Sequence, residues 1–168
     1  MIDVGVNLTN KRFDKVRTEL ITRAKNLGID KLLITGTSVN ESKQALALCH
    51  HYQQQFPDSL YATAGVHPHD ADGVSEDYLE ELSKLAQQPK IKAIGECGLD
   101  FNRNFSTPEQ QLKVFKEQIH LAKEYSMPLF LHQREAFQPW FSELKPFFGQ
   151  LPAMIAHCFT GTKSELEK

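Results

Sequence analysis

Three potential metal ligands, Glu96, His132 and His157, each end or directly follow a short apolar run of the kind that forms a buried strand. Because neighbouring strands of a parallel sheet lie about 4.8 Å apart, side chains at three successive strand ends come within reach of one ion. One carboxylate and two imidazoles suit Zn²⁺, Mn²⁺ or a similar divalent ion. A single histidine at a strand end is more often a hydrogen-bonded core residue, but three in register favour a metal site.

A loop with two more histidines, residues 65–70 (Gly-Val-His-Pro-His-Asp), follows another apolar run. Pro68 stiffens this loop. His67 and His69 are therefore candidates to orient a phosphate or a metal-bound water, or they simply cap the loop that follows. The residues alone leave both interpretations open.

Arginines and aromatic residues near the strand ends are candidates for substrate binding. Arg103 lies in a polar loop, 100–104, and Arg134 follows the fifth run; a guanidinium offers a fork of donors suited to phosphate. Loop aromatics more often pack against the protein, but they also stack on unpaired bases. The loop aromatics here are Phe101, Phe105 and Phe159.

Six apolar runs alternate with charged, amphipathic segments along the whole chain. The runs start 25 to 37 residues apart and cover 2–7, 31–36, 61–66, 91–95, 128–132 and 153–157. Between runs, apolar positions recur every three or four residues, which predicts helices with one face on a sheet. The clearest example comprises Leu112, Phe115, Ile119 and Ala122.

A strand–helix–strand period near 30 residues predicts right-handed crossovers and a parallel sheet. An open doubly wound sheet collects its chemistry at one switch point, whereas all strand ends of a (β/α)8 barrel face the same mouth. Polar candidates follow five of the six runs, from Asn7 to His157, and no glycine-rich phosphate loop is present. We therefore predict one domain over residues 1–168: an α/β, TIM-type (β/α)8 barrel of which this chain supplies about the first six units, incomplete at its C-terminal end.

The charge and cysteine content exclude other classes of protein. Nineteen basic and 21 acidic residues give a net charge of −2, so no long-range field draws the chain to nucleic acid or anionic lipid. Three cysteines without a CxxC pair fit a reducing compartment, and the N-terminus lacks the pattern of a signal peptide. These features predict a cytoplasmic protein with no membrane segment.

Several sequence blocks, in this order and spacing, resemble the TatD family of metal-dependent deoxyribonucleases, which are amidohydrolase-like barrels. The blocks are 3–8, 65–69, 95–101 and 156–161, with 131–134 between the last two. The resemblance runs over all 168 residues. The block 3–8 and the loop 101–107 are similar to the subgroup that gives the family its name.

The resemblance implies an enzyme that removes nucleotides from the 3′ end of DNA with a divalent metal ion, Mg²⁺, Mn²⁺ or Zn²⁺. It implies Glu96, His132 and His157 as metal ligands, Glu96 as the central catalytic carboxylate, and His67 as a catalytic residue near the scissile phosphate. The candidates for binding a single-stranded or 3′-end DNA substrate are Asn7, His69, Arg103 and Arg134.

This chain departs from the family pattern at two places. Most members carry a His-x-His pair on the first strand, where this chain has Gly5 and Asn7, so a fully ligated second metal is not implied. The last ligand of the family, an Asp after the eighth strand, is not among these 168 residues. In the complete enzyme that Asp would be the natural general base. If the chain ends at Lys168, exposed edges on its first and sixth strands predict a dimer or a marginally stable product.

Two other functions remain open at this stage. One is a small-molecule amidase or lactonase that uses the same metal, against which Arg103, Arg134 and Phe101 argue mildly. The other is a non-catalytic fragment that only folds or associates.

Overall fold

The computed structural model describes residues 1–168, in which strands and helices alternate along the chain. The strands are β1 (Ile2–Val6), β2 (Lys31–Ile34), β3 (Leu60–Ala64), β4 (Ile91–Asp100), β5 (Leu129–Arg134) and β6 (Met154–His157). The α-helices are α1 (Arg17–Asn26), α2 (Val39–His51), α3 (Tyr78–Ala86), α4 (Pro108–Glu124), α5 (Phe137–Leu144) and α6 (Lys163–Leu166). Short 3-10 helices are η1 (Lys11–Phe13), η2 (Pro68–Gly73) and η3 (Lys145–Phe147).

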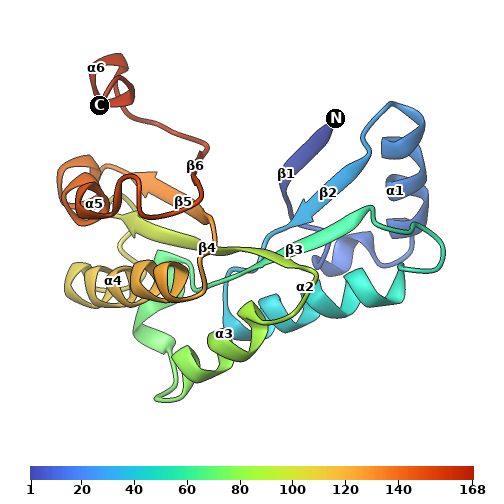
Figure 1. The fold of residues 1–168 in the computed structure, drawn as a ribbon, viewed down its shortest axis with the longest axis horizontal. Helices are drawn as coiled ribbons and strands as arrows, with labels where there is room; N and C mark the ends of the chain where they lie inside the picture. The colour runs from blue at the N-terminus through green and yellow to red at the C-terminus, as the bar shows by residue number, and fades with distance from the viewer.

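All six strands form one sheet in the order of the chain, and every neighbouring pair is parallel. The sheet curves, with helices along its outer side and with β1 and β6 as its two ends (Figure 1). The result is a half-barrel, which confirms the prediction of six β/α units from a TIM-type barrel. The carboxyl ends of all six strands therefore meet at one rim.

Helix α4 shows how local sequence signals build this architecture. Thr107 caps the helix by accepting a hydrogen bond from the backbone N–H of Gln110, and Pro108 occupies the first turn, where no amide donor is needed. The apolar stripe of α4 is buried in the core, with Phe115 at 0% and Ile119 at 1% exposure. The helix thereby seals the outer face of the sheet at β4.

Strand β4 is longer than its apolar run predicts, and it continues through Glu96 to Asp100. The prediction of a polar loop starting at Asp100 is therefore wrong. Pairing with β5 resumes at Cys97 after an irregularity, although the residues there are no longer a simple apolar run. Gly98 makes this pairing possible, because a Cβ there would lie 1.9 Å from the carbonyl oxygen of His132 and its φ is +147°.

The two ends of the sheet are less buried than its centre. Ile2 in β1 and Ile155 in β6 are 59% and 39% exposed, whereas Ile94 in β4 is fully buried. No helix combines the length and the apolar character needed to cross a membrane. Strands at the centre of the sheet are thus more deeply buried than β1 and β6 at its ends.

A candidate metal and nucleic-acid site

Three side chains from neighbouring strands meet at the carboxyl rim of the half-barrel. His67 follows β3 and caps η2, Glu96 lies within β4, and His132 lies within β5. One potential ligand atom from each residue lies within 4.8 Å of the other two. We call these three residues the rim cluster.

Glu96 is the centre of the rim cluster. Its Oε1 lies 3.1 Å from Nδ1 of His132 and 3.8 Å from Nε2 of His67. Burial alone would raise the pKa of the Glu96 carboxyl, but the hydrogen bond from His132 and the charges of the nearby histidines outweigh it and lower that pKa. Glu96 is therefore a carboxylate at neutral pH, although only 8% of the residue is exposed.

His67 is close to Glu96, but its proton is fixed by a local contact. Its Nδ1 accepts a hydrogen bond from the backbone N–H of His69 at 3.2 Å. Burial lowers the pKa of His67 to about 4, so the ring is neutral at pH 7. A neutral imidazole whose Nδ1 accepts carries its proton on Nε2, the atom that faces Glu96. His67 thus presents an N–H donor rather than a lone pair to the centre of the site.

Asp100 is a functional candidate that the sequence reasoning missed. Its Oδ2 accepts a hydrogen bond from Nε2 of His69 at 2.7 Å and lies 3.5 Å from Nε2 of His132. Burial would raise the pKa of Asp100, but the backbone N–H groups of Arg103 and Asn102 and the His69 ring lower it to about 2. Asp100 is therefore a carboxylate, only 1% exposed, that holds the His69 ring by a hydrogen bond and faces the His132 ring.

A simple signal would have identified Asp100 from the sequence. Alternate residues of a strand share one face, so Glu96, Gly98 and Asp100 point to the same side of an extended segment. The glycine between the two acids leaves room for the backbone of His132. The pattern of two acids around a glycine predicts a polar face on β4, provided that the strand is recognised as continuing.

His157, the third ligand predicted from the sequence, lies beside the rim cluster but outside it. It is the register partner of His132, and its charge lowers the pKa of Glu96. Its ring packs 5.1 Å from the ring of Phe130, and its Nε2 lies 3.2 Å from Sγ of Cys158. A Cβ at Gly5 would lie 2.8 Å from the His157 ring, so the glycine in β1 leaves the space that this ring uses.

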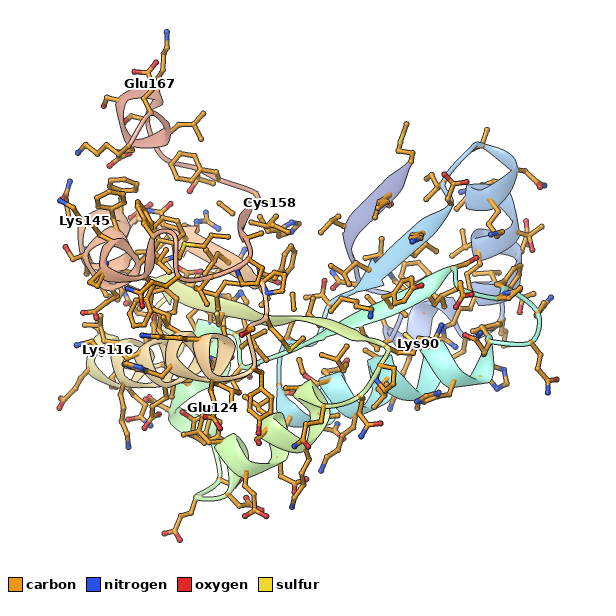
Figure 2. The ribbon with its side chains drawn as sticks, in the orientation of Figure 1. Lys90, Lys116, Glu124, Lys145, Cys158 and Glu167 are labelled. Atoms are coloured by element: carbon orange, nitrogen blue, oxygen red, sulfur yellow. The ribbon has the colours of Figure 1, made fainter.

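The two cysteines that follow predicted ligands have opposite environments. Cys97 is fully buried in the core, as its position on an alternating strand predicts. Cys158 is exposed and lies at the side of β6 that faces β1 (Figure 2). The chain turns at Cys158, whose φ is 46°, and this turn ends the alternation of the strand.

The predicted substrate-binding residues lie at or just beyond the carboxyl ends of β1, β3, β4 and β5. Arg134 ends β5 and is half-buried, whereas Arg103 is exposed; neither forms an ion pair. His69 is engaged with Asp100, and its ring lies 4.8 Å from that of Phe105, which is 65% exposed. Asn7 is exposed just beyond β1 and lines a polar pocket of about 260 Å³ at the same rim.

The donors present fit a divalent metal ion. Oxygen and nitrogen ligands at about 2.1 Å from one ion lie roughly 3 Å apart when they coordinate at right angles. The 3.1 Å separation of Glu96 Oε1 and His132 Nδ1 matches this requirement. The other ring nitrogen of His132 is buried without a hydrogen bond and lies 3.5 Å from Asp100. A metal-binding histidine characteristically turns its second nitrogen toward such a carboxylate.

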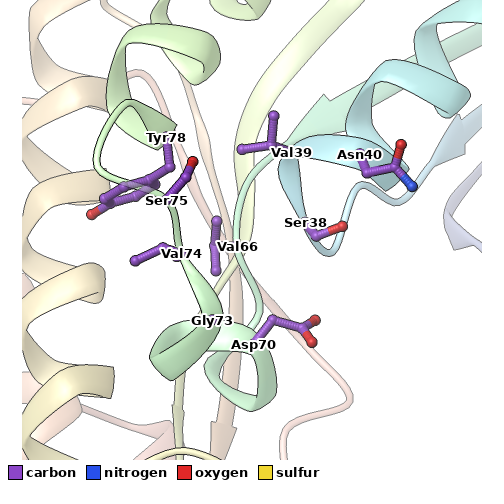
Figure 3. Close-up of a pocket in the computed structure, with 9 residues that line it drawn as sticks. All are labelled: Ser38, Val39, Asn40, Val66, Asp70, Gly73, Val74, Ser75 and Tyr78. Carbon is purple, nitrogen blue, oxygen red and sulfur yellow. The ribbon is translucent and has the colours of Figure 1, made fainter.

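A different cavity of about 290 Å³ lies between the start of α2 and the segment that joins η2 to α3 (Figure 3). Ser38, Val39, Val66 and Tyr78 are among its lining residues, and no member of the rim cluster contributes to it. The candidate metal ligands of the chain are therefore concentrated at the rim of the half-barrel and not in this cavity.

The whole chain is similar to proteins of one known family. The sequence profile of the family described as TatD related DNase matches residues 2–168. A protein of Erwinia tasmaniensis named 3'-5' ssDNA/RNA exonuclease TatD is 52% identical over 99% of this chain. A protein of Pectobacterium parmentieri with the same name is 50% identical over 99% of this chain. This chain spans 63% of the length of each of these two curated relatives.

Solved structures share the fold. A hydrolase TatD family protein from Entamoeba histolytica superposes with a TM-score of 0.90 at 30% identity, over 99% of this chain and 60% of that one. A TatD homologue from Escherichia coli superposes with a TM-score of 0.87 at 30% identity, over 99% of this chain and 63% of that one. From the family profile over nearly every residue and the shared half-barrel, it follows that this chain belongs to the TatD related DNase family.

Proposed function

We propose that this chain carries the metal-dependent site of a 3′–5′ exonuclease that hydrolyses phosphodiester bonds at the end of single-stranded DNA. The observation that carries the proposal is the rim cluster with its buried partner Asp100, placed where the strands of a barrel end. The names of the relatives from Erwinia tasmaniensis and Pectobacterium parmentieri support the same substrate class and extend it to RNA.

Glu96 and His132 would hold the metal ion through Oε1 and Nδ1, with the proton of the His132 ring moved from Nδ1 to Nε2, the nitrogen that faces Asp100. His157 is the proposed third ligand, since it is the register partner of His132 on the next strand. When bound, the ion polarises a phosphoryl oxygen and lowers the pKa of its water. Glu96 contributes the negative charge that attracts the cation, and Asp100 fixes the orientation of the His132 ring.

His67 acts on the substrate rather than on the metal in this proposal. Its Nε2–H faces the centre of the site, and such a donor stabilises charge that develops on a phosphoryl oxygen. His69, Arg103, Arg134 and Asn7 lie around the rim cluster as groups that bind the rest of the strand. The arginines are suited to phosphates because each offers several donors in a fixed plane.

The substitution Glu96→Gln tests the function. The amide has nearly the same shape, but it removes the charge, so we expect hydrolysis of a 5′-labelled single strand with Mn²⁺ or Mg²⁺ to fall by at least about 100-fold. Glu143→Gln on α5 is the control, because that residue lies on an outer helix and pairs only with Lys116. The assay uses the complete enzyme, and equal hydrolysis by its Glu96→Gln variant and its unaltered form contradicts the proposal.

A further inference from the structure

A second polar feature lies at the same rim, at the ends of β1 and β2. It is a pocket of about 260 Å³ without a single apolar lining residue. The lining residues are Asn7, Thr9, Asn10, Arg12, Thr35, Thr37 and Glu41. We call it the threonine pocket. Cavities for drug-sized ligands measure about 300–1,000 Å³, so this one suits a smaller group.

Thr35 contributes a hydroxyl to the threonine pocket. The residue as a whole is only 3% exposed, and its side chain lines the pocket. Its backbone N–H is already used by the carbonyl of Val6 in the sheet. The hydroxyl is not among the buried, unpaired polar atoms of the chain, so it is open to the pocket and can hydrogen-bond a ligand that enters. The side chains of Asn7 and Thr37 have no partner within the chain.

The threonine pocket is joined directly to the rim cluster through the backbone of the segment that follows β2. The carbonyl of Thr37 accepts a hydrogen bond from the backbone N–H of His67 at 2.7 Å. The carbonyl of Gly36 accepts one from the backbone N–H of Glu96 at 2.9 Å. A group bound in the pocket is therefore a neighbour of whatever the rim cluster binds.

The charges of the threonine pocket favour a hydroxylated, uncharged group over a phosphate. Glu41 places a carboxylate in the wall, and no cationic side chain pairs with it. Arg12 is the single cation of the wall, and its guanidinium lies 4.4 Å above the ring of Phe13. Hydroxyls, amides and one carboxylate are the usual partners of sugar hydroxyls, whereas the carboxylate would repel a phosphate dianion.

We propose that the threonine pocket binds the sugar of the 3′-terminal nucleotide and recognises its free 3′-hydroxyl. This inference rests on the proposed function, because the terminal sugar of a 3′–5′ exonuclease substrate is attached to the phosphate that is cleaved at the rim cluster. Glu41 accepts the hydrogen bond of the 3′-hydroxyl, and Thr35 and Asn7 bind the remaining sugar oxygens. The same carboxylate rejects strands that end in a 3′-phosphate.

Binding measured without catalysis tests the threonine pocket. The probes are two 5′-fluorescein-labelled single strands of six nucleotides, identical except for a 3′-hydroxyl or a 3′-phosphate end, titrated by fluorescence anisotropy in EDTA. We expect the unaltered chain to bind the 3′-hydroxyl strand at least about 10-fold more tightly, as one like-charge contact predicts. Glu41→Gln is expected to reduce this preference to about threefold or less. Glu19→Gln, an exposed carboxylate on α1, is the matched control and should retain it.

A pair of substitutions at Thr35 separates hydroxyl recognition from packing. Thr35→Val keeps the shape and removes the hydroxyl, so the 3′-hydroxyl strand should bind about 10-fold more weakly, as for a lost hydrogen bond in a buried site. Thr35→Ser keeps the hydroxyl and should remain within about threefold of the unaltered chain.

Four results overturn the inference about the threonine pocket. They are equal binding of the two strand ends, no binding of either strand, an end preference that Glu41→Gln leaves unchanged, and tighter binding of the 3′-phosphate strand that Arg12→Ala abolishes. The last result would identify a phosphate pocket. The proposed function fails separately, through the hydrolysis assay with Glu96→Gln, so the two failures are distinguishable.

Discussion

His67 and His157 flank the pair of Glu96 and His132 from two different regions of the sheet. His67 comes from its centre, where 12% of the side chain is exposed and Nδ1 is fixed by the backbone of the next turn. His157 comes from β6, which pairs with β5 alone and in which Ile155 is 39% exposed. His67 is close to Glu96 but carries its proton on Nε2, the nitrogen that faces Glu96. The edge histidine is farther away but is held by fewer contacts.

This comparison shows that distance alone does not identify a ligand. A metal ion requires a lone pair, and the hydrogen bond at Nδ1 of His67 leaves the proton on Nε2, where a ligand atom would have to be. The ring of His157 is not part of the rim cluster, but it packs near Phe130, Cys158 and Gly5, and no backbone N–H fixes its proton on a particular nitrogen. The following predictions test how far centre and edge differ.

The largest difference between the centre and the edge of the sheet should appear in the free energy of unfolding. Ile94→Ala in β4 is expected to lower the free energy of unfolding by about 2–5 kcal/mol, because it leaves a cavity in a close-packed core. Ile155→Ala in β6 should cost less than about 1 kcal/mol, since much of that side chain is already in water. Urea denaturation of both variants provides the measurement. Equal losses would show that β6 is as firmly packed as the centre of the sheet.

Metal affinity should distinguish the two histidines. We expect His157→Ala to weaken Mn²⁺ binding by at least about 100-fold, because it removes a direct ligand and even the loss of an outer-shell partner costs up to that much. His67→Ala should change the affinity by less than about fivefold, because its Nε2 is protonated in this geometry. Isothermal titration calorimetry measures both. The reverse order would assign His67 to the ligand set and remove His157 from it.

Asp100→Asn should have a smaller effect, because Asp100 acts through its neighbours. The amide is neutral, so both His69 and His132 lose their charged partner, and the Mn²⁺ affinity should fall by about 10-fold. Asp30→Asn is the control, since Asp30 pairs only with the N-terminus at the surface. An unchanged affinity in the Asp100→Asn variant would mean that the buried carboxylate serves the fold alone.

The smallest expected effect is on the pH dependence of the free energy of unfolding. The pKa of His67 is lowered from 6.5 to about 4 in the folded chain, so the unfolded chain binds the proton more readily between these values. Stability from this group is present above about pH 6.5 and is lost as the pH falls toward 4. Between about pH 6.5 and 5.5 the loss amounts to roughly 1 kcal/mol. Over the same pH interval, the free energy of unfolding of the His67→Gln variant should fall by about 1 kcal/mol less than that of the unaltered chain. Urea denaturation without added metal measures this difference. A parallel pH dependence in both proteins would contradict the burial of a neutral His67.

The candidate site could be predicted from the sequence only in part. Glu96 and His132 follow apolar runs, and the period of those runs is enough to place them on neighbouring strands. Asp100 was missed because the apolar run stops at Gly95, although β4 continues. Pairing with β5 extends the strand, and such pairing depends on a segment more than 30 residues away. The threonine pocket was missed because Thr35 and Thr37 carry no motif of their own.

The sequence by itself determined the parallel half-barrel, because the spacing of apolar runs and the apolar stripes of the helices are local properties that any β/α unit requires. It also determined that acids and histidines would meet at the carboxyl rim, since all parallel strands end there. Only the tertiary structure decided which nitrogen of His67 carries the proton, which carboxylate faces His132, and that the side chain of Thr35 opens into a polar pocket. These properties depend on contacts between segments distant in the chain, and hydrogen bonding and burial at such contacts are set by packing rather than by local pattern.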